Sequence, residues 1–170
     1  TSTAMNGLDS VNNVWNPSVM NDYQMRMRYD ANGNILNMTR NGFNFGITKP
    51  EMDELQYHYL PYKNQLNYID DAIDKGNYAE DLDDQIPDNY AYDATGNLIM
   101  DRSEEIASIE WNVYGKVKKI TRKVGSTKPG LEFSYDGMGQ RVSKTVNKKT
   151  GKPESTSYVR DATGNIMATY

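Results

Sequence analysis

The chain has 170 residues, of which 37% are hydrophobic and 25% are charged, and its formal net charge at pH 7 is −4. This length suffices for one domain, whereas the mean hydropathy of −0.81 predicts a thin hydrophobic core. The absence of cysteine excludes a disulfide framework and thiolate metal sites, and no apolar run approaches the roughly 18 residues of a membrane-spanning helix.

Residues 1–22 precede the first regular pattern. They are rich in Asn and Ser, and their only strong apolar anchors are Val11, Val14 and Trp15. They also lack the basic and then apolar layout of a secretion signal. We expect an irregular leader or a poorly matched repeat here, followed by one repetitive region over residues 23–170.

The repetitive region reuses one short phrase, which consists of an aromatic residue, Asp or Asn, two free positions and Gly. The five copies read YDANG (29–33), YDATG (92–96), WNVYG (111–115), YDGMG (135–139) and RDATG (160–164), and in the last copy Arg160 stands in place of the aromatic residue. Repetition on this scale is the signature of a repeat architecture. The long interval between the first two copies holds a degenerate copy at residues 62–66, in which we expect Asn64 to adopt the left-handed conformation.

Each phrase has the chemistry of a β-turn. An Asp or Asn side chain at the first turn position hydrogen-bonds backbone two residues on, and Gly at the fourth position adopts positive φ without steric cost. Apolar and polar residues alternate before the turn, as at residues 25–29 and 131–135, which is the period of a strand with one covered face. Each phrase therefore predicts a hairpin tip. The predicted turn residues are Asp30, Gly33, Asp93, Gly96, Asn112, Gly115, Asp136, Gly139, Asp161 and Gly164.

The phrase Tyr-Asp-x-x-Gly-Asn with a following apolar pair, as at residues 29–36 and 92–99, resembles the YD repeats of Rhs (rearrangement hotspot) proteins. Such repeats also occur in the C-components of insecticidal toxin complexes and in teneurins. Over residues 23–170, the resemblance implies antiparallel hairpins that form part of a hollow shell around a toxin or effector domain, in a secreted or cell-envelope protein. The Asp-Pro-x-Gly self-cleavage signature of these families is absent here. The resemblance therefore implies neither proteolysis nor toxicity for this chain.

An acidic stretch interrupts the repeats. Residues 70–88 contain eight acidic residues against Lys75 alone. At its start, Ile69, Ala72 and Ile73 have the spacing of one helical turn, and Gly76 would end it. We expect an all-β fold that carries a short acidic loop or helical insertion near residues 69–88.

Residues 115–153 are strongly basic, with eleven Lys and Arg against two acidic residues. We favour the interpretation that these charges keep exposed strands soluble and unpaired. The alternative is a polyanion-binding platform, with aromatic residues too sparse to favour nucleic acid. A third hypothesis places the acidic stretch over these strands or over those of a neighbouring copy. The candidate polyanion-binding residues are Lys116, Lys118, Lys119, Arg122 and Lys123.

Catalytic and metal-binding patterns are sparse. His58 is the only histidine, and its place between Tyr57 and Tyr59 suits a cross-strand polar position better than a catalytic one. Residues 30–41 start like a calcium-binding loop but lack the Gly and Glu that such a loop requires. We predict no catalytic, cofactor or metal site. The predicted function is structural, and the alternative is a surface module that binds carbohydrate or a polyanion.

The expected partners follow from the repeats. The chain has thirteen Tyr against three Phe, and a hairpin with one tyrosine-lined face cannot bury that face alone. We expect contacts with further repeats and an effector domain, and a homodimer through open sheet edges. A glycan is a further candidate ligand. The pattern is cut at both ends of the chain, so we interpret the chain as a piece of a longer protein.

Overall fold

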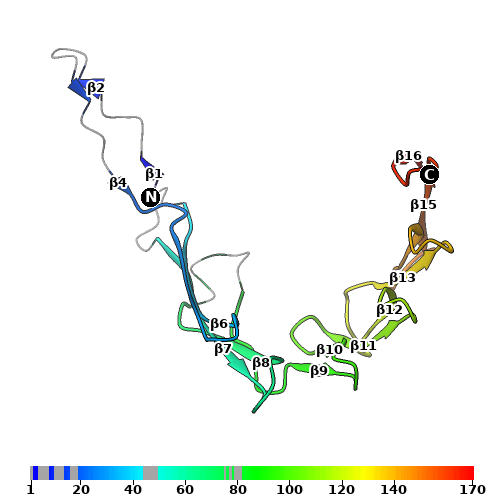
Figure 1. The fold of residues 1–170 in the computed structure, drawn as a ribbon, viewed down its shortest axis with the longest axis horizontal. Coiled ribbons are helices and arrows are strands. Elements are labelled where there is room, and N and C mark those ends of the chain that lie inside the picture. The colour runs from blue at the N-terminus through cyan, green and yellow to red at the C-terminus, as the bar shows by residue number, and fades with distance from the viewer. Residues whose placement is uncertain are drawn as a thin grey trace. The chain divides into compact units, whose positions relative to one another are not determined.

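The computed structural model describes residues 2–3, 8–9, 14–15, 19–43, 50–74, 76, 78 and 82–170. All regular elements in these ranges are β-strands, and every strand pair is antiparallel (Figure 1). The predicted all-β class of antiparallel hairpins is therefore confirmed. The chain divides into two compact units, Thr1–Pro87 and Asp88–Tyr170. The described ranges hold no helix of the length and hydropathy needed to cross a bilayer.

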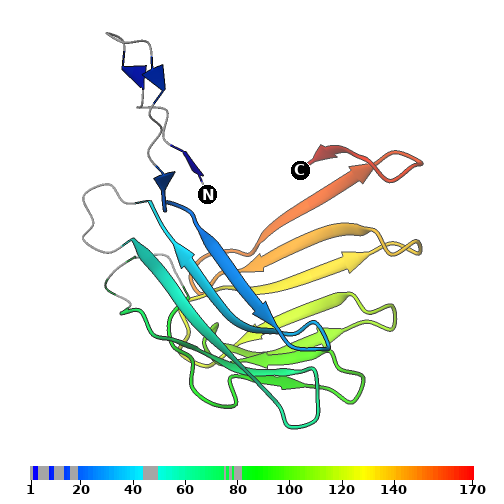
Figure 2. The same cartoon turned by 60° about the vertical axis from the view of Figure 1, so that its left-hand side comes forward.

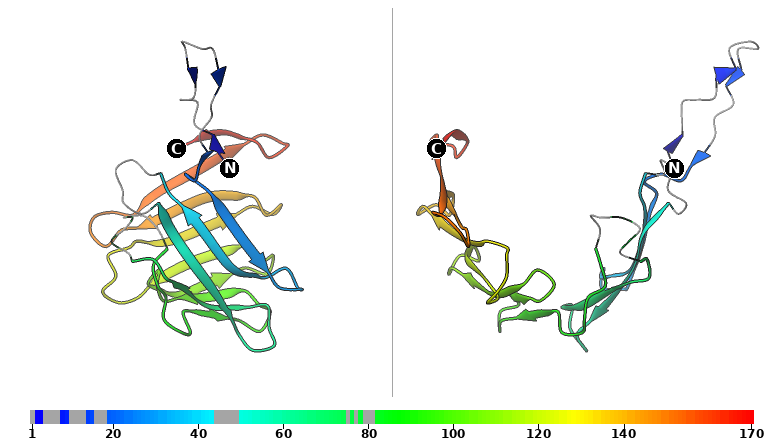
Figure 3. Two further views of the ribbon diagram at one scale, coloured as in Figure 1. Left: turned by 90° about the vertical axis from the view of Figure 1, so that its left-hand side faces the viewer. Right: turned by 180° about the vertical axis from the view of Figure 1, so that it is seen from behind.

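The first unit is built on a four-stranded meander, whose strands lie side by side in Figure 3. In chain order and in spatial order they are β5 (Met25–Tyr29), β6 (Ile35–Asn41), β7 (Glu51–Tyr59) and β8 (Leu66–Asp71). Within the predicted leader, β1 (Ser2–Thr3) pairs with β4 (Val19–Met20), and β2 (Leu8–Asp9) pairs with β3 (Val14–Trp15). Val11, one of the expected anchors, lies outside the described residues.

The second unit is an eight-stranded meander in which each strand pairs with its neighbours in sequence (Figure 2). Its strands are β9 (Tyr90–Tyr92), β10 (Leu98–Asp101), β11 (Ile106–Trp111), β12 (Val117–Arg122), β13 (Gly130–Tyr135), β14 (Arg141–Asn147), β15 (Glu154–Arg160) and β16 (Ile166–Thr169). The chain reverses at every turn, so the four repeat turns of this unit lie at one end of its sheet.

The hydrophobic core is thin, in agreement with the low mean hydropathy. In the first unit, Leu55 and Ile69 are the buried apolar residues, and in the second they are Ile106 and Ile109, as far as the structure describes them. In the second unit an apolar row crosses the sheet, because Ile120 lies opposite both Ile109 and Leu131. Each sheet therefore depends on a few buried side chains and on its hydrogen-bonded ladders.

The described residues of the acidic stretch form no helical turn, which corrects the helical alternative for residues 69–74. Ile69 and Asp71 belong to β8 and are both buried, because they follow the two-residue period of a strand that pairs with β7. The loop beyond β8 returns along its outer edge. Gln85 donates its amide to the Ile69 carbonyl (3.0 Å), and Asp84 accepts the Asp71 amide at 2.7 Å. Lys75, Glu80 and Asp81 lie outside the described residues.

The degenerate hairpin tip also differs from expectation. The left-handed residue is Tyr62, with φ of 62°, and not Asn64. The turn is closed by Lys63, one residue before Asn64, because Lys63 donates its amide to the Leu60 carbonyl at 3.1 Å. Asn64 instead uses its side-chain oxygen to accept from Asn34 Nδ2 at 3.0 Å. The residue therefore joins two neighbouring tips.

The YDGMG turn contains two glycines that differ in their backbone conformation. Gly139 has a φ of +78°, whereas Gly137 lies outside the left-handed region, and both would hold a Cβ in open space. We expect Gly139→Ala to lower the free energy of unfolding by about 1–2 kcal/mol because of backbone strain alone. The matched variant Gly137→Ala should be neutral or should stabilise by about 0.4–1 kcal/mol. Urea denaturation measures both, and equal effects would show that φ is not the cause.

Candidate functional site

The repeat turns share one backbone geometry. In the first copy, Gly33 donates its amide to the Asp30 carbonyl (3.2 Å), and Asp30 donates its own amide to the Asn34 carbonyl (2.9 Å). The same two bonds recur in the other four copies. The structure thus places all ten predicted turn residues at hairpin tips. The φ values are 86° at Gly33, 91° at Gly96, 69° at Gly115, 78° at Gly139 and 94° at Gly164.

The Asp or Asn side chain closes each turn from inside. Asp30 Oδ1 accepts the amides of Asn32 and Asn34, both at 2.8 Å. Asp93, Asn112, Asp136 and Asp161 accept the corresponding amides two and four residues ahead. In three copies an Asn after the glycine adds a side-chain bond to the second carboxylate oxygen. Each tip is therefore held by contacts within five consecutive residues.

These hydrogen bonds favour the ionised carboxylates. The side-chain bond from Asn97, then that from Thr95, lowers the pKa of Asp93 from 3.8 to about 2. Asn165 and Thr163 lower the pKa of Asp161 to about 2 in the same way. The pKa of Asp30 is also lowered, mainly by the side-chain bond from Asn34.

Acid should weaken these turns. The folded-state pKa of Asp93 lies below its ordinary value of 3.8, so its contribution to stability is present above pH 3.8 and is lost as the pH falls to about 2. Asp93→Asn keeps an acceptor, as Asn112 does, but cannot titrate. We expect the melting temperature of this variant to fall less over that pH range than that of the parent chain. Parallel curves for the two proteins would contradict the assignment.

A second set of contacts links adjacent hairpins. At four of the turns, the residue immediately before the turn donates from its side chain to a backbone carbonyl of the preceding hairpin. We call this contact the lateral link. It joins Tyr59 Oη to the Ile35 oxygen (2.8 Å), Trp111 Nε1 to the Leu98 oxygen (2.8 Å) and Tyr135 Oη to the Val117 oxygen (2.7 Å). In the fifth copy the donor is Arg160, whose Nε and Nη2 lie 3.3 and 3.2 Å from the Arg141 oxygen.

The acceptor of the lateral link always has the same place in the repeat. Ile35, Leu98, Val117 and Arg141 each lie two residues after the turn glycine of the preceding hairpin. Sequence reasoning did not predict this contact. The signal was present, because Tyr, Trp and Arg all carry an N–H or O–H donor, whereas Phe never occupies the position before a repeat turn.

Three of the five candidate polyanion-binding residues have partners within their own sheet. Lys119 Nζ lies 3.1 Å from Glu132 Oε1, and this contact raises the pKa of Lys119 and lowers that of Glu132. Arg122 Nε donates to the Pro129 carbonyl (3.1 Å) and Lys123 Nζ to the Arg102 carbonyl (3.0 Å). The other two, Lys116 and Lys118, are exposed. Polyanion binding thus stays a prediction, with these two lysines as its best candidates.

The only histidine occupies a cross-strand position. His58 Nε2 lies 2.8 Å from Asp70 Oδ2, and its ring stacks on Tyr68 with centroids 4.3 Å apart. In the ranges that the structure describes, no three His, Asp or Glu side chains are grouped so that they could hold a metal ion. The contacts of His58 are those of a polar residue on a sheet face.

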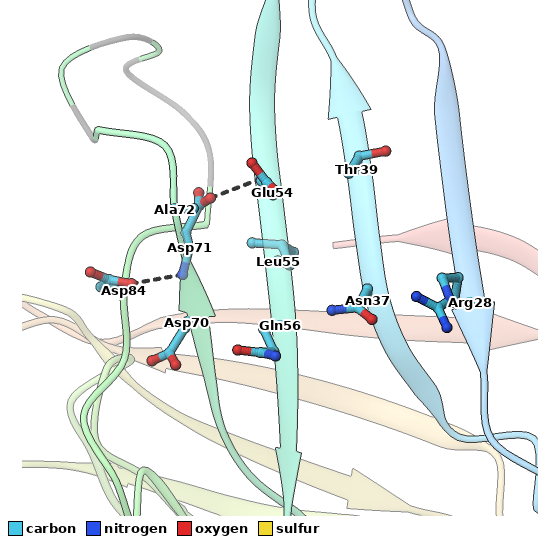
Figure 4. A pocket seen from close by; sticks show the side chains of 10 residues that line it. All are labelled: Arg28, Asn37, Thr39, Glu54, Leu55, Gln56, Asp70, Asp71, Ala72 and Asp84. Carbon is cyan, nitrogen blue, oxygen red and sulfur yellow. Dashed lines mark hydrogen bonds between the residues drawn. The ribbon is translucent and has the colours of Figure 1, made fainter.

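A polar groove of about 580 Å³ crosses one face of the four-stranded sheet (Figure 4). It is lined by Arg28, Asn37, Thr39, Glu54, Leu55, Gln56, Asp70, Asp71, Ala72 and Asp84. Asp71 accepts the Glu54 amide at 2.9 Å, which fixes one wall. Four carboxylates against one guanidinium make the groove suited to polar neutral or cationic groups, and unsuited to a polyanion.

Comparison with known proteins gives one limited similarity. No family model matches the chain. A stretch of 113 residues, 65% of this chain, is 30% identical to "Salivary gland surface protein 1" of Aedes aegypti. The chain spans about 3% of the length of that protein.

Proposed function

We propose that this chain is a non-catalytic structural segment, a sheet that grows by adding YD-type hairpins side by side. The observation that carries the proposal is the lateral link, which recurs at four hairpin junctions with donor and acceptor at equivalent positions. At these junctions Tyr, Trp or Arg immediately before the turn donates to the preceding hairpin. The position therefore serves to join adjacent hairpins in the sheet. The groups with perturbed pKa values are hairpin-tip carboxylates, a cross-strand ion pair and a hydrogen-bonded Tyr59.

The larger assembly that we propose is a shell that encloses or scaffolds a toxin or effector domain, in a secreted or cell-envelope protein. This part rests on the resemblance of the repeated turns to the YD repeats of Rhs proteins. The proposed location agrees with the name of the similar protein from Aedes aegypti, which is called a surface protein.

The lateral link can be tested by removing one oxygen atom. Tyr135→Phe deletes the hydroxyl that donates to the Val117 carbonyl and should lower the free energy of unfolding by about 0.5–1.5 kcal/mol. Hydrogen exchange should rise in both hairpins that the link joins. The matched control is Tyr29→Phe, because among the described residues the Tyr29 hydroxyl donates only to the sulfur of Met27 in its own strand. Equal losses for the two variants would count against the proposal.

A second candidate function is saccharide binding in the polar groove. The specific observation is a row of planar polar side chains across the sheet, since Gln56 lies opposite both Asn37 and Asp70. The stacked pair of His58 and Tyr68 adjoins Asp70, and such rings pack against sugar faces. A glycan array should then show binding that Gln56→Ala abolishes. Absence of binding by the parent chain, or binding that survives the substitution, would reject this candidate.

A further inference from the structure

Three neighbouring strands of the second unit hold one arginine between two aromatic rings. Arg141 begins the middle strand, β14, while Phe133 and Tyr158 stand on the flanking strands β13 and β15. The guanidinium carbon of Arg141 lies over both rings, 5.6 Å from the Phe133 centroid and 5.0 Å from the Tyr158 centroid. Both distances are those of cation–π contacts. The guanidinium is therefore fixed from both sides by its neighbouring strands.

The hydrogen-bond donors of this guanidinium are not used within the described part of the chain. Arg141 Nε is buried without a hydrogen-bond partner, and the side chain makes no hydrogen bond or ion pair with any described residue. The lateral link from Arg160 reaches only the backbone carbonyl of Arg141. Because Nε is covered, the two terminal nitrogens are the donors left for an incoming group. A guanidinium edge fixed in this way suits a carboxylate, which accepts two parallel N–H bonds.

The acidic residues of the surrounding strands and turns are already engaged elsewhere. Those of residues 130–164 are Glu132, Asp136, Glu154 and Asp161. The two glutamates pair with lysines other than Lys144, and the two aspartates accept backbone amides of their own turns. The positive charge of Arg141 therefore lacks an acidic partner in this part of the sheet.

A second cation shares this face of the sheet. Lys144 lies directly opposite Phe133 on β13 and makes no ion pair with the described residues. Directly opposed residues of an antiparallel pair point to the same face. Arg141 lies opposite Tyr135, two residues along β13 from Phe133. The two cations therefore belong to successive rows of one face, which are about 7 Å apart along the strands.

We propose that Arg141 and Lys144 bind two carboxylates of an acidic, extended segment of a partner polypeptide. In an extended chain, alternate side chains point to the same face and are also about 7 Å apart. Acidic residues at positions i and i+2 of the segment therefore meet both cations at once. One carboxylate accepts from the terminal nitrogens of Arg141, and the other accepts from the Lys144 ammonium group. The spacing of the two cations favours such a segment over a single compact anion such as phosphate.

Titration of the full chain with two short peptides tests this spacing. The probe is acetyl-Thr-Glu-Thr-Glu-Thr-amide. The control, acetyl-Thr-Glu-Glu-Thr-Thr-amide, has the same composition and charge, but its carboxylates point to opposite faces when extended. Nuclear magnetic resonance should show that the probe shifts the Arg141 Nε–H signal and binds roughly two- to fivefold more tightly than the control. Equal affinity of the two peptides, or an unchanged Nε–H signal, would overturn the proposal.

Variants and other anions complete the test. Arg141→Gln should weaken binding of the probe peptide roughly tenfold or more, as expected for a lost charge-assisted contact. Lys152→Gln removes the same charge from an exposed residue between β14 and β15 and should change the affinity by less than about twofold. The Nε–H shift in the parent chain is an independent measurement if Arg141→Gln fails to fold. Inorganic phosphate that shifts this signal at the same concentration as the probe, or tighter binding of an oligosaccharide of uronic acids, would overturn the proposal.

Discussion

Replacing Arg40 by methionine is expected to lower the free energy of unfolding by about 3 kcal/mol or more. Arg40 Nε pairs with Asp53 Oδ2, and the Asp53 side chain is fully buried. The other carboxylate oxygen, Oδ1, has no hydrogen-bond partner in the described part of the chain. Removal of the guanidinium would leave a buried charge without compensation. The Arg40 side chain is 39% exposed, so we expect a loss near the lower end of the range for buried pairs.

The double variant Arg40→Met with Asp53→Leu is the matched control. Apolar replacement of a buried ion pair is often neutral or stabilising, so the second change should recover most of the loss. Urea denaturation at pH 7 gives the three free energies needed for the cycle. A single-variant loss below about 1 kcal/mol, typical of an exposed pair, would show that the pair contributes as a surface contact.

Leu55→Ala is expected to cost about 2–5 kcal/mol. Leu55 is 3% exposed on the central strand β7 and faces Met38 and Asp71 across the sheet. The first unit buries few apolar side chains, so little remains to fill the cavity that truncation would leave. The thinness of this core therefore makes the unit sensitive to a single substitution.

Leu36→Ala provides the control on the neighbouring strand, because Leu36 is 36% exposed. It should cost markedly less, since water already reaches the side chain. The midpoint and slope of denaturant unfolding measure both variants. Similar losses at the two positions would contradict the view that stability is concentrated at the few buried residues.

The fold class was predictable because the turns are chemically local. Asp30 and Gly33 form a tip with contacts inside five residues, so the sequence alone carries the turn signal. The alternation before each turn then predicts strands on either side. Residues 1–22 held no such signal, and the sequence left them as either an irregular leader or a partial repeat.

The features that sequence reasoning missed depend on neighbours distant in the chain. Ile69 has neighbours at both helical and strand spacing, and only its pairing with Tyr57 on β7 decides for the strand. Asn64 was predicted to be the left-handed residue, but its side chain accepts a hydrogen bond from Asn34 and Tyr62 adopts the left-handed conformation. In the sequence, Arg160 departs from the aromatic pattern of the other copies. Arg160 acts as a donor in the same way as Tyr135, but this requires the Arg141 carbonyl, which only the folded structure brings near its side chain.

The self-contained hairpin tips have a consequence for how such chains change length. Each repeat turn is closed by contacts within five residues, and adjacent hairpins are joined by backbone pairing together with one side-chain donor and one carbonyl at equivalent positions. A whole hairpin is therefore a unit that can be duplicated or deleted, after which its former neighbours still present matching groups to each other. Proteins built in this way can gain or lose modules during evolution without redesign of the remaining modules.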